Sequence, residues 1–165
     1  MKKHILAITA AALTLSSINA AYADGVRRNA HENAAGGVTA GGQRAVSGPW
    51  GGRAAGEGGV LTNGDGVGIG GSRGCAEGAG GGWGCRRGIT ARDEDGNVVH
   101  ADSGYAEGPL GNTASTSGGW TRDEDGDISG DRNSEVTIGD RTYSAESTYD
   151  SDDGFDRDVS CSGDC

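Results

Sequence analysis

The chain has 165 residues, 34 of which are glycine, and carries a net charge of −10 at pH 7. Large aliphatic side chains are scarce, which excludes one extensive hydrophobic core that orders the whole chain. The negative charge argues against nonspecific binding to nucleic acid or to an anionic membrane surface, because both need a cationic protein. We therefore expect no nucleic-acid partner.

The first 23 residues have the pattern of a secretory signal peptide. Lys2 and Lys3 form a basic head, residues 5–18 are mostly apolar, and residues 21–23 (AYA) are a small-x-small cleavage site. We expect cleavage near Ala23 and a protein that is secreted or periplasmic. The apolar run is short and interrupted by Thr and Ser, so we expect no membrane span after signal cleavage.

Residues 24–88 form a glycine-rich segment without a helical or alternating apolar period. Residues 66–71 (GVGIGG) match the spacing G-x-G-x-x-G, but they lack the strand and helix context that a dinucleotide site needs. Glycine loses more backbone entropy on folding than any other residue. This composition predicts a mostly disordered, flexible N-terminal arm over 24–88.

Residues 89–165 are acidic and contain a repeat. Residues 92–98 (RDEDGNV) recur as 122–128 (RDEDGDI), and a degenerate third copy covers 150–155. The DEDG sequence is typical of a type I turn followed by a glycine bulge, and residues 143–149 alternate as a half-buried strand does. The segment 89–165 is predicted to be a small all-β unit, an antiparallel meander of five or six short hairpin strands. A β-solenoid-like stack of turns is the alternative.

The predicted sheet has few large side chains for its apolar face, so it has little to bury by itself. Its polar edges are available for strand addition. We therefore expect self-association through β edges.

Four cysteines lie in a chain that we expect to enter an oxidising compartment, which favours disulfides over thiols. Three pairings are possible, of which the local one joins neighbours in sequence. A zinc site is disfavoured because closely spaced C-x-x-C pairs are absent from the sequence. The expected disulfide residues are Cys75, Cys85, Cys161 and Cys165.

The repeated acidic turns place oxygen ligands at alternate positions, as part of a calcium loop does. The match to an EF-hand is partial, because Ala91 and Thr121 stand where the first ligand belongs. Weak calcium binding and simple hairpin turns with solvated charges are the two interpretations. The candidate ligands are Asp93, Asp95, Asn97, Asp123, Asp125 and Asp127.

We expect no enzymatic activity and no cofactor other than calcium. His31 and His100 occur in no recognisable catalytic pattern, and a chain this poor in core residues offers little to build a desolvated pocket for acid–base chemistry.

The signal peptide, the glycine-rich segment and the Asp-Gly hairpin repeats ending in CSGDC (161–165) resemble small glycine-rich exported proteins of Gram-negative bacteria with no assigned role. The resemblance is compositional and implies no site residues. We expect a noncatalytic exported surface or extracellular-matrix protein that acts through binding or self-association. A weak calcium-binding secreted module and a secreted toxin or bacteriocin-like protein are the alternatives.

Overall fold

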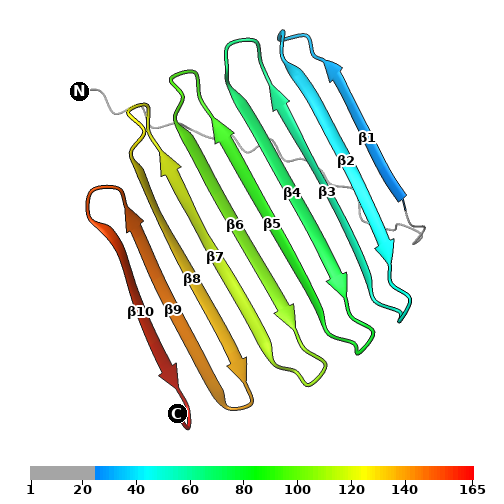
Figure 1. The fold of residues 1–165 in the computed structure, drawn as a ribbon, viewed down its shortest axis with the longest axis vertical. Helices are drawn as coiled ribbons and strands as arrows, with labels where there is room; N and C mark the ends of the chain where they lie inside the picture. The colour runs from blue at the N-terminus through cyan, green and yellow to red at the C-terminus, as the bar shows by residue number, and fades with distance from the viewer. Residues whose placement is uncertain (1–24) are drawn as a thin grey trace.

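The computed structural model describes residues 25–165 and shows one open antiparallel sheet of ten strands (Figure 1). The strands lie across the sheet in chain order, so each strand pairs with its neighbours in sequence. The predicted signal peptide, with its cleavage site, lies outside the described residues. The strands are β1 Gly25–Glu32, β2 Val38–Ser47, β3 Arg53–Thr62, β4 Gly68–Glu77, β5 Trp83–Arg92, β6 Val98–Glu107, β7 Thr113–Arg122, β8 Ile128–Ile138, β9 Arg141–Asp150 and β10 Gly154–Ser162.

The predicted antiparallel meander is confirmed. Strands β6 to β10 and the end of β5 lie within 89–165, and each joins the next through a hairpin. The solenoid alternative is wrong, because stacked solenoid coils pair their strands in parallel and every pairing here is antiparallel.

The meander also runs through the glycine-rich half, which corrects the expectation of a flexible arm over 24–88. Residues 25–88 form β1 to β4 and the first part of β5. The physical reason is that glycine has two structural roles in this segment. Some glycines turn the chain at a regular interval, and others lie opposite one another in the strands, as Gly41 does with Gly59. Cross-strand backbone pairing therefore orders a segment that side chains alone would not.

The turns follow a period of 15 residues. Glycines with positive φ occur at this interval at Gly36, Gly51, Gly66, Gly81, Gly96, Gly111 and Gly126. Further positive-φ glycines at Gly139, Gly154 and Gly163 do not all keep the interval. In seven turns the backbone N–H of the first turn residue donates to the carbonyl oxygen four residues later, as Asp93 does to Asn97 at 3.1 Å. This is the type I turn with a glycine bulge that the DEDG sequence predicts.

The register is regular enough to define two faces. Residues directly opposite each other share a face, and successive residues along a strand alternate between faces. One face carries Asp102, Trp120 and Arg132, and we call it the Trp120 face. The other carries Cys75, Glu57 and Arg73, and we call it the Cys75 face.

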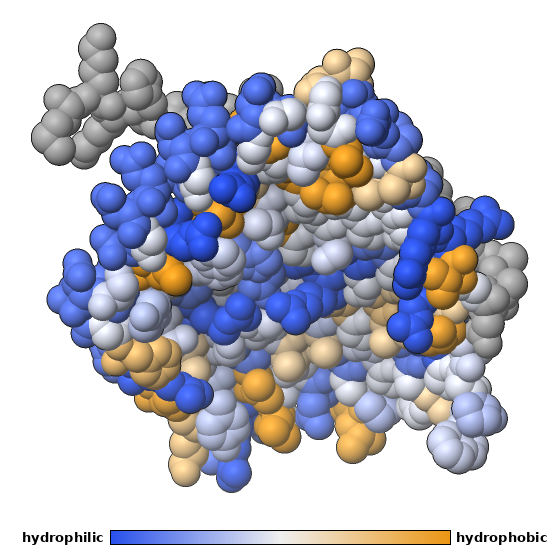
Figure 2. Space-filling model, turned by 45° about the horizontal axis from the view of Figure 1, so that its top comes forward, coloured by the Kyte–Doolittle hydropathy of each residue, from blue (hydrophilic) through white to orange (hydrophobic). Residues whose placement is uncertain are grey.

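No hydrophobic side chain is buried anywhere in residues 25–165. A single layer has no partner layer against which either face can pack, so twenty large hydrophobic side chains remain exposed. On the side seen in Figure 2 the hydrophobic residues form separate patches among polar ones. The thin apolar face expected from the sequence is thus uncovered.

Replacing Gly126 with alanine tests the role of the turns. Gly126 has φ +97°, and a Cβ added there would have no heavy atom within 4 Å, so the cost comes from the backbone conformation alone. We expect the free energy of unfolding to fall by about 1 to 2 kcal/mol. Gly80→Ala is the matched control, since Gly80 has equal space but no positive φ. Urea unfolding followed by circular dichroism measures both, and equal losses would show that positive φ is not what requires the glycine.

Candidate functional site

Asp102 on β6 lies at the centre of a charged cluster on the Trp120 face. Its side chain is 2% exposed, and it is the only buried polar or charged residue of the described chain. Arg132 on β8 donates from Nη2 to Oδ1 at 2.7 Å and from Nη1 to Oδ2 at 3.4 Å. Arg86 on β5 donates to Oδ2 at 3.3 Å. The carboxylate is therefore paired from both sides of its strand.

A glycine makes the main pair possible. Asp102 and Arg132 lie on strands that are not neighbours, and Gly118 on β7 stands between them in the same row. A Cβ at Gly118 would collide with the carbonyl oxygen of Asp131 and lie 3.0 Å from Cα of Arg132. The absence of a side chain at this position opens the path for the guanidinium across β7.

The cluster holds the carboxylate in its charged form. The hydrogen bond from Arg132 lowers the pKa of Asp102 and outweighs desolvation, which raises it, while Arg86 lowers it further. A buried carboxylate needs this compensation, because an unpaired charge away from water is costly. Asp102 thus links β6 to β5 and to β8 through its ion pairs with Arg86 and Arg132.

His100 joins the edge of this cluster, although the sequence offered no recognisable setting for it. Its Nδ1 lies 2.8 Å from Oγ1 of Thr90, its ring stacks on Trp120 with centroids 5.7 Å apart, and its Nε2 lies 3.6 Å from Oδ1 of Asp102. The nearest partner of the Asp102 carboxylate is therefore Arg132, at 2.7 Å, rather than the imidazole of His100. The sequence signal for this arrangement is the alternation His100-x-Asp102, which puts both side chains on one face.

The six predicted calcium ligands lie in two turns, β5–β6 and β7–β8. Asp93 accepts hydrogen bonds from the backbone N–H of Asn97 at 2.9 Å and from Nδ2 of Asn97 at 2.8 Å. Asp123 accepts from the backbone N–H groups of Gly126 and Asp127, each at 2.9 Å. The bond from the Asn97 side chain lowers the pKa of Asp93. The first carboxylate of each copy therefore caps its own turn.

The same capping occurs in the glycine-rich half with a neutral residue. Asn33 accepts through Oδ1 from the backbone of Ala35 and Gly37, and Asn63 does so from Asp65 and Val67. An amide oxygen thus replaces the carboxylate of Asp93 at equivalent places. Over residues 25–165 no three His, Cys, Asp or Glu side chains are grouped so as to hold a metal ion.

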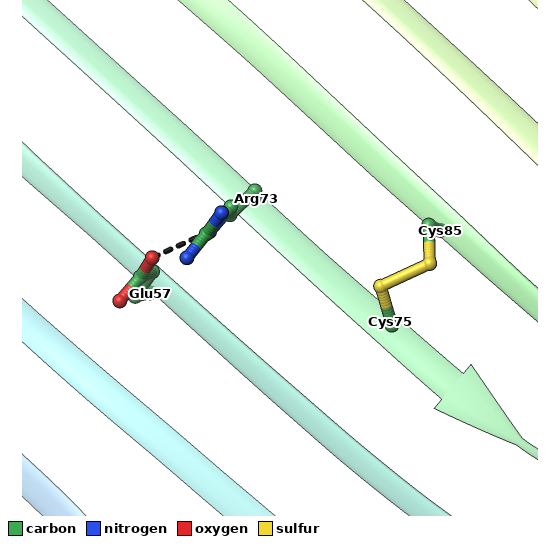
Figure 3. The surroundings of a disulfide bond; sticks show 4 residues. All are labelled: Glu57, Arg73, Cys75 and Cys85. Atoms are coloured by element: carbon green, nitrogen blue, oxygen red, sulfur yellow. Dashed lines mark hydrogen bonds and ion pairs between the residues drawn. A yellow bond between two sulfur atoms is a disulfide. The ribbon is translucent and has the colours of Figure 1, made fainter. Parts of the chain in front are cut away.

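The cysteines pair locally, which selects one of the three connectivities left open by the sequence. Cys75 on β4 bonds Cys85 directly opposite on β5, on the same face as Glu57 and Arg73 (Figure 3). Cys161 on β10 bonds Cys165 four residues later. Two disulfides indicate an oxidising environment.

A row of polar and charged residues crosses the whole Cys75 face. Arg73 Nε lies 2.5 Å from Oε1 of Glu57 (Figure 3), and Gln43 donates to Oε2 of Glu57 at 3.3 Å. Arg87 continues the row with a 3.0 Å bond to Ser103. We call it the charged row; its members are Arg27, Gln43, Glu57, Arg73, Arg87, Ser103, Ser117, Asn133, Glu146 and Asp158.

The two edge strands, β1 and β10, have backbone groups on their outer sides that no described strand pairs with. Every residue of β1 and of β10 is exposed, and no described strand pairs with the outer side of either. The outward backbone N–H and carbonyl groups of such strands are a template for another strand. The edges, together with the uncovered faces, form the candidate interaction surface.

Comparisons with protein-family models, with curated proteins and with solved structures found no match to this chain. Among the described residues no helix has the length and apolar character needed to cross a membrane.

Asp102→Asn tests the cluster. Because the pKa of Asp102 is lowered on folding, its stabilisation is complete above the unfolded pKa of about 3.9 and is lost as the pH falls through the folded pKa. At pH 7 we expect the free energy of unfolding to drop by about 1.5 to 3 kcal/mol. The difference in the free energy of unfolding between the variant and the wild type should become smaller below about pH 4.

Urea unfolding over a series of pH values measures that difference. Asp125→Asn, in an exposed turn, is the control for removal of one carboxylate and should change stability little. A difference for Asp102→Asn that stays constant from pH 7 to pH 2 would show that the charge of Asp102 is not what stabilises the sheet.

Proposed function

We propose that this is a noncatalytic exported protein of the cell surface or extracellular matrix that acts through self-association. Support for export comes from the signal-like first 23 residues and from the two disulfides. Support for self-association comes from the architecture of the sheet.

The observation that carries the proposal is a ten-stranded single layer without one buried hydrophobic side chain in residues 25–165. Stable domains bury the apolar side of a sheet against a second layer. Leu61, Trp83, Tyr105 and Phe155 are among the side chains that this sheet leaves exposed. A further copy of the chain supplies both a second layer for the faces and a neighbour for the edges.

The noncatalytic part of the proposal rests on how the one buried carboxylate of the described residues is used. Asp102 is charged and paired with Arg132 and Arg86, and acid–base catalysis instead needs a group poised to exchange a proton. Most other charged side chains lie on open faces or in turns, in contact with water.

Sedimentation velocity of the exported protein tests the proposal. We expect the mean size to rise with protein concentration, and fibre diffraction of the assembled material to show spacings of about 4.7 Å between strands and about 10 Å between sheets. A protein that stays monomeric at all concentrations, with a retained β spectrum, would refute self-association.

Weak calcium binding is a second candidate function, favoured by one observation. The third copy of the acidic repeat folds back beside the second: the backbone N–H of Ser151 donates to the carbonyl oxygen of Ile128 at 2.8 Å, and a shallow depression there is lined by Asp123, Asp127, Asp150 and Asp152. A divalent cation would relieve the repulsion among these carboxylates.

Calorimetry of the exported protein against Ca²⁺ tests this second function. We expect binding with a dissociation constant of about 0.1 to 1 mM, as for extracellular modules. Asp127→Asn should weaken it, whereas Asp140→Asn, in the turn at the opposite end of the sheet, should leave it unchanged. The absence of heat at several millimolar Ca²⁺ would leave the acidic segments as hairpin turns alone.

A further inference from the structure

We propose that copies of this chain add head to tail, with β10 of one copy beside β1 of the next in the register that continues the charged row. This inference rests on the proposed self-association and names its contact. The product is an open filament, because repeated translation across the strands never closes.

The strand directions permit such an addition. The sheet has ten antiparallel strands in chain order, and an even number places β1 and β10 in opposite directions (Figure 1). A copy translated across the sheet therefore presents its β1 antiparallel to β10. The junction then repeats the pairing found between all neighbouring strands within the chain.

The backbone groups of the two edges match in this register. Bonded pairs alternate along an antiparallel ladder. Counting from the turn bond between Asn33 and Gly37, the odd residues of β1 face β2, so even residues such as Arg28 face outward. The same count from the turn bond between Asp123 and Asp127 leaves the odd residues of β10, such as Val159, facing outward.

The continued register sets outward residues of β10 opposite outward residues of β1. Val159 then faces Val26, and Phe155 faces Ala30, with all four side chains on the Trp120 face. Each of these residues is exposed in the single chain, Phe155 to 67% and Val159 to 66%. The contact covers apolar surface as well as satisfying backbone groups.

Charge complementarity selects this partner. Asp158 lies opposite Glu146 within the chain, so the acidic end of the charged row has a like charge on its inner side. The continued register supplies Arg27 on its outer side and places Asn29 opposite Asp156. The row already contains such a cross-strand pair in Glu57 and Arg73.

Symmetric pairing of identical edges is disfavoured by the same charges. Two β10 strands paired about Arg157 would set Asp156 against Asp158 in both directions, and two β1 strands would bring their Arg27 and Arg28 side chains together. Like charges directly opposite each other are destabilising in a sheet. A head-to-tail contact is thus preferred over a closed dimer.

One pair of residues within the two strands is unfavourable in the proposed register, and Asp153, just before β10, would also face Glu32 at the end of β1. Arg157 would face Arg28 on the Trp120 face. Arg157→Glu should therefore lower the concentration at which filaments form, about tenfold, whereas Asp158→Arg, one residue away, should raise it about tenfold. These opposite effects are expected when β10 lies beside the basic residues of β1, and the exchange of charge between Arg27 and Asp158 tests the register itself.

The experiment measures the concentration for assembly of the exported protein by sedimentation and electron microscopy. Arg27→Asp and Asp158→Arg should each impair assembly, and an equal mixture of the two variants should restore it, because each then supplies the charge that the other lacks. Glu124→Arg, in an exposed turn, changes the net charge as Asp158→Arg does and is the control for that variant. Circular dichroism confirms that each variant keeps its sheet.

The outcomes separate this inference from the proposed function. Filaments that form equally well from all variants would overturn the head-to-tail register and leave self-association intact. Closed dimers of the wild type would also overturn it. A wild-type protein that stays monomeric would overturn both.

Discussion

The structure depends on backbone pairing between strands of nearly equal length that reverse direction every 15 residues. A glycine at the bulge of each regular turn lets the chain enter positive φ, and in alternate turns the side chain of the first turn residue stabilises that conformation. In four turns that residue is Asn33, Asn63, Asp93 or Asp123, whose side-chain oxygen accepts backbone hydrogen bonds. Because every strand is paired with its neighbour in sequence, order spreads over residues 25–165 without a hydrophobic core.

The same regularity places side chains in straight rows across the sheet. Asp102 meets Arg132, which is 30 residues away, because the two lie in one row with Gly118 between them. Glu57 meets Arg73 in the charged row for the same reason. A sheet that exposes both faces to water is thus held by backbone bonds, by these ion pairs and by the Cys75–Cys85 disulfide.

The proposed role follows from the two edge strands that such a sheet leaves unpaired. Proteins usually protect their edge strands with charge, bulges or covering segments. Here the charges at the two edges differ in kind, with Arg27 and Arg28 on β1 and Asp156 and Asp158 on β10. Charges that repel identical edges also attract unlike edges. The same charges therefore disfavour symmetric pairing and favour head-to-tail assembly.

The sequence by itself determined the features that are local. The Asp-Gly turns, the antiparallel strands after residue 88 and the alternation along 143–149 follow from turn chemistry and strand geometry. The glycine-rich half was predicted incorrectly, although Gly36, Gly51, Gly66 and Gly81 keep the same period, because many other glycines hide that spacing. Only the tertiary structure decided which residues meet across strands: the partner of Asp102, the local disulfides and the capping role of Asp93. Those contacts depend on the register between strands, which is set by all the turns together and by no single segment of the chain.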